Sequence, residues 1–135
     1  MTHKKHSLNL LLKNKCKITK QRLTLCDIIF DGKNKHFRAE DIKKILRNKK
    51  LNISLATIYN NLNFFVKSGM LKSKNLGNIS YYDNNINNHY HYYDIENKKL
   101  IDIPAKKIKF SHFPKMPRNK KIKNINLIIN LENND

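Results

Sequence analysis

Two histidines one residue apart, His89 and His91, stand in the stretch HYHYYDI and are the side chains of this sequence best suited to metal chemistry. Side chains of a β-strand alternate between its two faces, so a strand through this stretch places both imidazoles on one face. Two such imidazoles can bind one divalent metal ion, with further ligands supplied from elsewhere in the chain. The alternative is that both are polar residues on the solvated face of a strand.

The cysteine content limits which metal sites the chain can build. Cys16 and Cys26 are the only cysteines, they are ten residues apart, and they form no C-x-x-C pair. A structural zinc site needs four ligands and is usually rich in thiolates, so no structural zinc held by four cysteines is expected. No disulfide framework is indicated either. A reduced, cytoplasmic protein is the simplest interpretation.

The charge of the chain favours an anionic partner. Its 135 residues carry a formal net charge of +18, from 28 Lys and Arg against 10 Asp and Glu. Residues 1–83 hold +13 of this excess, which favours nucleic acid as the partner of that part. The 21 Asn residues suggest an alternative, in which an AT-biased genome contributes some of the lysines. Because no long apolar stretch and no signal peptide is present, no membrane partner is expected.

Three helices and a hairpin are predicted in the first part of the chain. The stretches ITKQRLTLCDIIF, FRAEDIKKILRNKK and NISLATIYNNLNFFVKSGML each repeat apolar residues at helical spacing. Thr19 and Ser54 are suitable N-caps for the first and third helices, and Gly69 ends the third. Gly77-Asn78 between MLKSKNL and ISYYD predicts a two-residue hairpin turn. Helices followed by a hairpin are typical of a winged helix, whose last helix enters the DNA major groove and whose hairpin is a two-stranded wing.

Polar side chains on the third predicted helix suit base recognition. Thr57, Asn60 and Asn61 lie opposite its apolar stripe, and an asparagine can bond the adenine edge with two contacts. The lysines that flank these elements suit phosphate contacts. These lysines are Lys15, Lys17, Lys20, Lys72 and Lys74.

The stretches CKITKQRL, HFRAEDIKKIL, ISLATIYNNLNFFVKSGML and ISYYD together resemble the DNA-binding half of the ferric uptake regulator family. The resemblance covers about residues 16–131 and is most specific before Asp83. It implies a minor-groove contact by Lys17 and a base contact by Tyr59. The family usually has arginine after this tyrosine and this chain has Asn60, which implies a different operator preference. The predicted DNA-binding residues are Lys15, Lys17, Lys20, Arg22, Thr57, Tyr59, Asn60, Asn61, Lys72 and Lys74.

The resemblance also supplies ligands that could join the two histidines. It implies a metal site that takes three imidazole nitrogens and two carboxylates, a set that suits Mn(II) or Fe(II), with Zn(II) also compatible. The alternative is that His36 caps a helix and that the other positions are solvated surface residues. The implied metal ligands are His36, Asp83, His89, His91 and Asp102.

The second half of the chain is similar to the iron response regulator branch of this family. Where most members carry C-x-x-C, this chain has DIEN, followed by the DIP of residues 102–104. That branch implies a response to haem, which His89 and His91 could ligate through imidazole. The cysteine-proline haem motif is absent, because Lys17 follows Cys16. Pro114 and Pro117 argue against a helix before the apolar run of residues 125–131, which is expected to be a closing strand.

The sequence therefore predicts an α+β protein. Residues 1–83 form the winged-helix domain, residues 84–88 form a hinge, and residues 89–135 form a small α/β or β-rich dimerisation domain that senses metal or haem. The alternative for the hinge is an ordinary polar linker.

The predicted function is that of a homodimeric repressor or other transcriptional regulator of iron and metal homeostasis on AT-rich double-stranded DNA operators. It would respond to iron, manganese or haem through a site between the two domains. The alternative is a low-specificity architectural DNA-binding protein whose sensor has decayed. An enzyme is not expected, because no nucleophile–base arrangement is apparent and the implied ligands would leave no open metal position for water.

Overall fold

The computed structural model describes residues 5–135, which fold as two compact units, one ending at Ile86 and one beginning at Asn87. The boundary lies within residues 84–88. That these residues act as a hinge stays a prediction.

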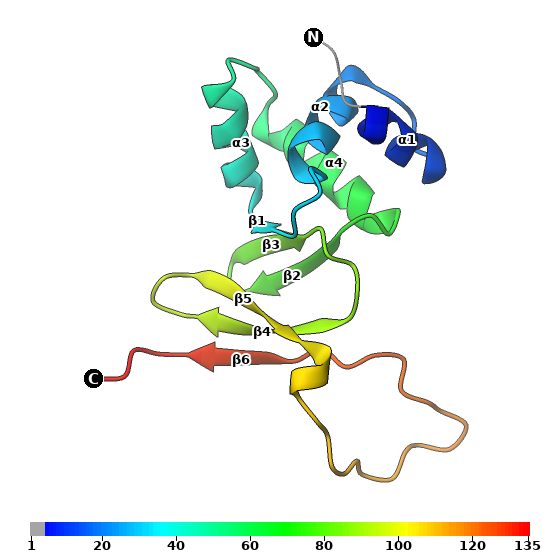
Figure 1. Ribbon diagram of the computed structural model, residues 1–135, viewed down its shortest axis with the longest axis vertical. Helices are drawn as coiled ribbons and strands as arrows, with labels where there is room; N and C mark the ends of the chain where they lie inside the picture. Colours follow the sequence, from blue (N-terminus) through cyan, green and yellow to red (C-terminus); the bar gives the residue numbers. More distant parts are fainter. Residues whose placement is uncertain (1–4) are drawn as a thin grey trace. The chain divides into compact units, whose positions relative to one another are not determined.

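Four helices form most of the first unit (Figure 1). Three of them were predicted from the sequence, with the expected N-caps. The Thr19 hydroxyl accepts a hydrogen bond from the Arg22 amide, and the Ser54 hydroxyl accepts one from the Thr57 amide. The helices are α1 (Lys5–Lys13), α2 (Lys20–Ile29), α3 (Ala39–Asn48) and α4 (Leu55–Lys67).

Helix α1 was not predicted, because its sequence has neither an acidic first turn nor a long apolar repeat. A nine-residue helix is marginal by itself in water, so its stability comes from packing. Leu11 is completely buried in the core of the unit, and the buried Ser7 hydroxyl donates a 2.6 Å hydrogen bond to Asp27 on α2. Helix α1 therefore extends the winged helix at its N-terminal side.

A three-stranded antiparallel sheet completes the first unit. It contains β1 (His36–Phe37), β2 (Lys72–Leu76) and β3 (Ile79–Asp83) in the order β1-β3-β2. The wing is confirmed as the β2–β3 hairpin, whose turn uses Gly77 at a φ of 63°, a conformation that glycine adopts readily. The short strand β1 was not predicted.

One hydrophobic core joins these elements. Leu25 of α2, Ile42 of α3 and Leu62 and Phe65 of α4 are almost completely buried. Tyr82 of β3 is buried in the same core, so the sheet packs against the helices. The apolar residues at helical spacing therefore bury one face of each helix, as the sequence predicts.

The second unit is built around a three-stranded sheet, which confirms the β-rich form of the predicted second domain. Strands β4 (His89–Asp94) and β5 (Lys99–Pro104) form an antiparallel hairpin, and β6 (Ile128–Leu131) pairs in parallel with the other side of β4. Tyr90 and Ile103 are buried cross-strand partners on one face of this sheet. A single 3₁₀ turn (Ala105–Lys107) follows β5, and the rest of the connection to β6 is irregular. In residues 5–135, no helix is long and apolar enough to cross a membrane.

Truncation of a buried leucine tests the contribution of α1. We expect Leu11→Ala to lower the free energy of unfolding by about 2–5 kcal/mol, because it leaves a cavity in the core. Leu12→Ala is the matched control, since Leu12 is 56% exposed, and should change stability by less than about 0.5 kcal/mol. Urea unfolding followed by circular dichroism measures both. Equal effects would mean that α1 does not belong to the cooperative core.

Candidate metal centre

Strand pairing brings together the two candidate ligands of the first unit. In the ladder between β1 and β3, His36 and Asp83 are direct partners. Their Nε2 and Oδ2 atoms are 3.4 Å apart. The other carboxylate oxygen, Oδ1, accepts a 2.9 Å hydrogen bond from the Asn85 amide. The carboxylate is therefore oriented by the turn that follows β3, with one oxygen directed at the imidazole.

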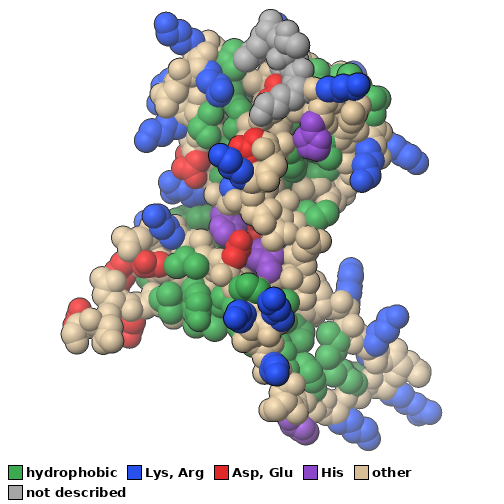
Figure 2. Space-filling view, in the orientation of Figure 1, with side chains coloured by type: hydrophobic (Ala, Val, Ile, Leu, Met, Phe, Trp, Pro, Cys, Tyr) green, Lys and Arg blue, Asp and Glu red, His purple; other side chains and the backbone are tan. Residues whose placement is uncertain are grey.

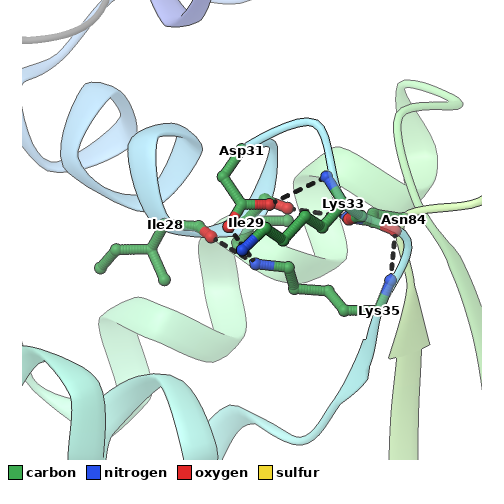
Figure 3. A network of polar contacts seen from close by, with 6 residues as sticks. All are labelled: Ile28, Ile29, Asp31, Lys33, Lys35 and Asn84. Carbon is green, nitrogen blue, oxygen red and sulfur yellow. Dashed lines mark hydrogen bonds and ion pairs between the residues drawn. The ribbon is translucent and has the colours of Figure 1, made fainter.

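A network around Asn84 fixes this pair from the adjacent loop (Figure 3). The Asn84 side-chain NH₂ donates 2.8 Å hydrogen bonds to the carbonyl oxygens of Ile29 and Lys33, and its Oδ1 accepts one from the Lys35 amide. The Lys35 ammonium group in turn contacts the Ile28 carbonyl oxygen and Asp31 Oδ2. Since Lys35 precedes His36 and Asn84 follows Asp83, the network holds the backbone on both sides of the ligand pair.

The second unit gathers the other three candidate ligands on one hairpin. His91 and Asp102 are direct cross-strand partners on β4 and β5, and His89 lies two residues before His91 on the same face. Asp102 Oδ1 is 3.2 Å from His89 Nε2 and 3.3 Å from His91 Nε2. The two imidazole rings meet edge to face, with centroids 4.5 Å apart. Both nitrogens therefore converge on one carboxylate oxygen.

A backbone carbonyl selects which nitrogen of His89 can bind a metal. His89 Nδ1 is 2.6 Å from the Asn87 carbonyl oxygen, which can only accept a hydrogen bond. Nδ1 therefore carries a proton, and in the neutral ring the lone pair is on Nε2, the atom near Asp102. Fixing a ligating imidazole through its other nitrogen is the usual outer-shell arrangement of metal sites.

The spacing of these atoms fits a bound cation. Two ligands bonded at about 2.1 Å to one ion lie roughly 3.0–3.4 Å apart in octahedral or tetrahedral geometry. The distances from Asp102 to the two histidines, 3.2 and 3.3 Å, lie within that range. The 3.4 Å distance between His36 and Asp83 lies at its edge. Lone pairs and carboxylate oxygens at such distances repel one another unless a proton or a metal ion lies between them. Each of these two groups of side chains, taken by itself, therefore has the chemistry of a divalent-cation site.

Thiolates do not contribute to these groups. Burial, followed by the charge of Asp27, raises the pKa of the Cys26 thiol to about 12. Cys16 is also buried, and its sulfur contacts Met70 and Ser68 at 3.8 Å. Both sulfurs belong to the core of the first unit.

The predicted DNA-binding residues all lie in the first unit, and those of α4 differ in their surroundings. Asn60 is exposed. The Tyr59 hydroxyl donates a 2.8 Å hydrogen bond to Glu40 of α3, and this bond and burial raise the pKa of Tyr59. Thr57 accepts a hydrogen bond from the Ser54 hydroxyl. The start of α4 therefore presents polar groups to solvent, with the Tyr59 ring positioned by α3.

Two predicted DNA-binding residues are engaged in contacts within the unit. Arg22 donates hydrogen bonds to Asn61 Oδ1 at 3.0 Å and to the Lys17 carbonyl oxygen at 2.8 Å. Its guanidinium carbon lies 4.1 Å from the centre of the Phe64 ring. Asn61 also donates to the Thr57 carbonyl oxygen. These contacts give Arg22 and Asn61 a role in joining α2 to α4, and a contact of either residue with DNA stays a prediction.

The five predicted phosphate-binding lysines surround these helices and the wing. Lys15, Lys17, Lys20 and Lys72 are exposed. Lys74 is half-buried, and burial, followed by the charge of Lys72, lowers its pKa. The four exposed ammonium groups can reach a phosphate backbone directly. Lys74 is already partly removed from water, so it is the least accessible of the five to a phosphate.

Sequence reasoning missed the positioning role of Asn84 and Lys35. Asn84 was counted with a polar linker, although it is bound to the loop between α2 and β1. Its position directly after Asp83 was the one indication available, because a residue that flanks a ligand is a natural place for an orienting contact.

Comparisons with known proteins identify relatives over most of the chain. Residues 13–130 match the family model described as the ferric uptake regulator family. The peroxide operon regulator of Bacillus subtilis (strain 168) is 34% identical over 100 residues, which are 73% of this chain and 68% of that protein. The ferric uptake regulation protein of Haemophilus influenzae is 38% identical over 78 residues, 57% of this chain and about half (53%) of that protein.

Solved structures share the fold. The ferric uptake regulator from Pseudomonas aeruginosa with manganese superimposes with a TM-score of 0.73 at 18% identity, covering 96% of this chain and 98% of that one. The Vibrio cholerae ferric uptake regulator gives a TM-score of 0.71 at 20% identity, covering 92% and 97%. These likenesses confirm the α+β class, with an N-terminal winged helix followed by a small β-rich domain.

Replacement of Asn84 tests whether its network supports the ligand pair. We expect Asn84→Ala to lower the free energy of unfolding by about 1–3 kcal/mol, because the Lys35 amide and two carbonyl oxygens lose their partner. It should also shift the His36 ring resonances in NMR spectra of the metal-free protein. Asn88→Ala is the matched control, since Asn88 is exposed, and should leave both unchanged. Unmoved His36 resonances would show that the network does not orient the pair.

Proposed function

Because the chain belongs to the ferric uptake regulator family, we propose that it is a transcriptional regulator of iron or metal homeostasis whose DNA binding responds to Mn(II) or Fe(II). Regulators of this family are dimeric DNA-binding proteins that bind Fe, Mn or Zn, and they are not enzymes. The single observation that supports metal sensing most strongly is the convergence of His89 and His91 Nε2 on Asp102 Oδ1, at 3.2 and 3.3 Å.

The proposed centre is one ion that takes ligands from both units. His89, His91 and Asp102 supply three donors from one rigid hairpin, and His36 and Asp83 supply two more. Three nitrogens and two carboxylates are a mixed donor set that suits Mn(II) or Fe(II), and Zn(II) is also compatible. A bound ion would supply the positive charge at this centre, and the five residues would hold it.

Metal binding of this kind would control the orientation of the DNA-binding unit. An ion held by both units would fix the angle across residues 84–88, and in a homodimer that angle would set the spacing of the two α4 helices. Whether the dimer matches two successive half-sites of a DNA operator would then depend on whether the metal site is occupied. The proposed location is the cytoplasm, where the DNA and the metal pool are.

Haem is the second proposed effector, and the hairpin geometry restricts how it could bind. Haem would supply an iron that takes imidazole as a protein ligand, so either histidine could hold it. His89 and His91 project from the same face of β4, with ring centroids 4.5 Å apart. We therefore propose that haem would take one of these two histidines and would compete with the metal ion for it.

In DNA recognition, we propose that α4 lies in the major groove and that the wing contacts the backbone. The exposed Asn60 amide suits the adenine edge, and the Tyr59 ring suits the thymine methyl group. Both preferences favour an AT-rich operator. Lys15, Lys17 and Lys20 before or at the start of α2, and Lys72 of the wing, would bind phosphates.

Metal stoichiometry tests the centre. We expect His91→Ala to reduce Mn(II) bound to well below one ion per subunit, because it removes the imidazole in direct register with Asp102. His36→Ala should leave one ion bound to the hairpin. The affinity for this ion should fall by more than the roughly 10- to 100-fold that is typical when a residue that only orients a metal ligand is replaced. Isothermal titration calorimetry and elemental analysis of the metal-stripped protein measure both.

The matched control for metal binding is His112→Ala, since His112 is exposed and outside the proposed ligand set. Unchanged stoichiometry in His91→Ala would exclude the proposed site. Tight operator binding that is indifferent to Mn(II) and haem in the unaltered protein would instead favour the architectural alternative with a decayed sensor.

Operator discrimination tests the recognition helix. We expect Asn60→Ala and Tyr59→Ala each to weaken operator binding by about 1–3 kcal/mol, because each variant leaves one base without its protein partner, and to change binding to random DNA much less. Tyr59→Phe keeps the ring and removes only the bond to Glu40, so it should retain most of the discrimination. Fluorescence anisotropy at one fixed salt concentration gives both affinities. An equal loss on both DNAs would make Tyr59 a packing residue.

A further inference from the structure

The connection between β5 and β6 has an unusual charge pattern. Residues 105–127 contain eight basic residues and no acidic one. The acidic residues of the second unit all lie elsewhere, on β4, β5, the turn between them and the C-terminal end. Residues 105–127 are named here the basic loop. Its basic residues are Lys106, Lys107, Lys109, Lys115, Arg118, Lys120, Lys121 and Lys123.

All eight basic side chains are exposed. Within residues 5–135, none of them has an ion pair. Figure 2 shows the blue side chains projecting around the loop that Figure 1 colours orange. The charge of this loop is therefore uncompensated and available to an anionic partner.

The basic loop is attached to the sheet of its unit by aromatic contacts. The Phe110 ring meets the buried Tyr90 of β4 edge to face at 6.0 Å, and Phe113 lies 5.6 Å from Phe110. Further along, Met116 and Ile122 are 39% and 44% exposed. The base of the loop is thus fixed to β4, and the segment after Phe113 carries most of the exposed charge.

Two observations favour DNA over a membrane surface as the partner. A membrane-binding segment usually forms an amphipathic helix with one continuous apolar face, whereas Pro114 and Pro117 interrupt this loop and it is irregular. The loop also belongs to the same chain as the winged helix, so DNA bound by that unit would be at a raised effective concentration for the loop wherever the loop can reach it.

We propose that the basic loop binds the phosphate backbone of the DNA that the winged helix recognises and adds affinity that does not depend on sequence. This inference rests on the proposed DNA-binding function. Each lysine that neutralises a phosphate releases condensed counterions, so the loop makes binding more sensitive to salt. It would also strengthen binding to any DNA, and the winged helix alone would carry the discrimination.

The salt dependence of binding tests this proposal in the full-length protein. We expect Lys120→Gln/Lys121→Gln to make the slope of log K against log salt shallower by about 0.9 for each phosphate that each subunit no longer neutralises. Affinity for operator and for random DNA should fall by the same factor. The matched control is Lys98→Gln/Lys99→Gln, an adjacent exposed pair in the same unit, beside the acidic Asp94 and Glu96 on the β4–β5 hairpin. The control should leave slope and affinity unchanged.

The outcomes separate this proposal from the function on which it rests. If the unaltered protein does not bind DNA, the proposed function fails. If it binds DNA and the two double variants give the same slope, only the role of the basic loop is overturned. Cosedimentation with vesicles of phosphatidylglycerol provides a further measurement. Vesicle binding that disappears in Lys120→Gln/Lys121→Gln, with an unchanged DNA slope, would assign the loop to anionic lipid and overturn its assignment to DNA.

Discussion

Antiparallel strand pairing is the interaction on which the candidate metal centre depends. The ladder between β1 and β3 makes His36 the direct partner of Asp83, and the ladder between β4 and β5 makes His91 the direct partner of Asp102. Backbone hydrogen bonds therefore determine the distance between the imidazole and the carboxylate within each of these two pairs. A slip of one residue in either pairing would move the ligand to the opposite face of its sheet.

The first unit separates a rigid interior from a polar surface. Its core is continuous through the four helices and the sheet, so the position of α4 is determined by buried apolar contacts. Arg22 adds a polar connection, because it bonds Asn61 and lies against Phe64. A recognition helix held in this way can present Asn60 and Tyr59 in a fixed orientation, which is what base recognition requires.

Electrostatics gives the two units different tasks in the proposed function. In the second unit, Asp102 of the β4–β5 hairpin suits a cation, whereas the basic loop suits a polyanion. In the first unit, Asp83 is one of few acids among many lysines and is oriented by Asn85 and the Asn84 network. Asp83 and Asp102 are thus placed where a cation would be bound.

The sequence by itself determined the local elements and the identity of the candidate ligands. Apolar periodicity, the caps Thr19 and Ser54 and the Gly77-Asn78 turn predicted α2, α3, α4 and the wing, because these features act over a few neighbouring residues. The family resemblance supplied His36, Asp83 and Asp102. Only the tertiary structure decided that α1 joins the core through Leu11, that β1 exists, that Arg22 pairs with Asn61, and that Asn84 binds the loop before His36. Each of these depends on contacts between residues distant in sequence, and such contacts form only when the whole core is assembled.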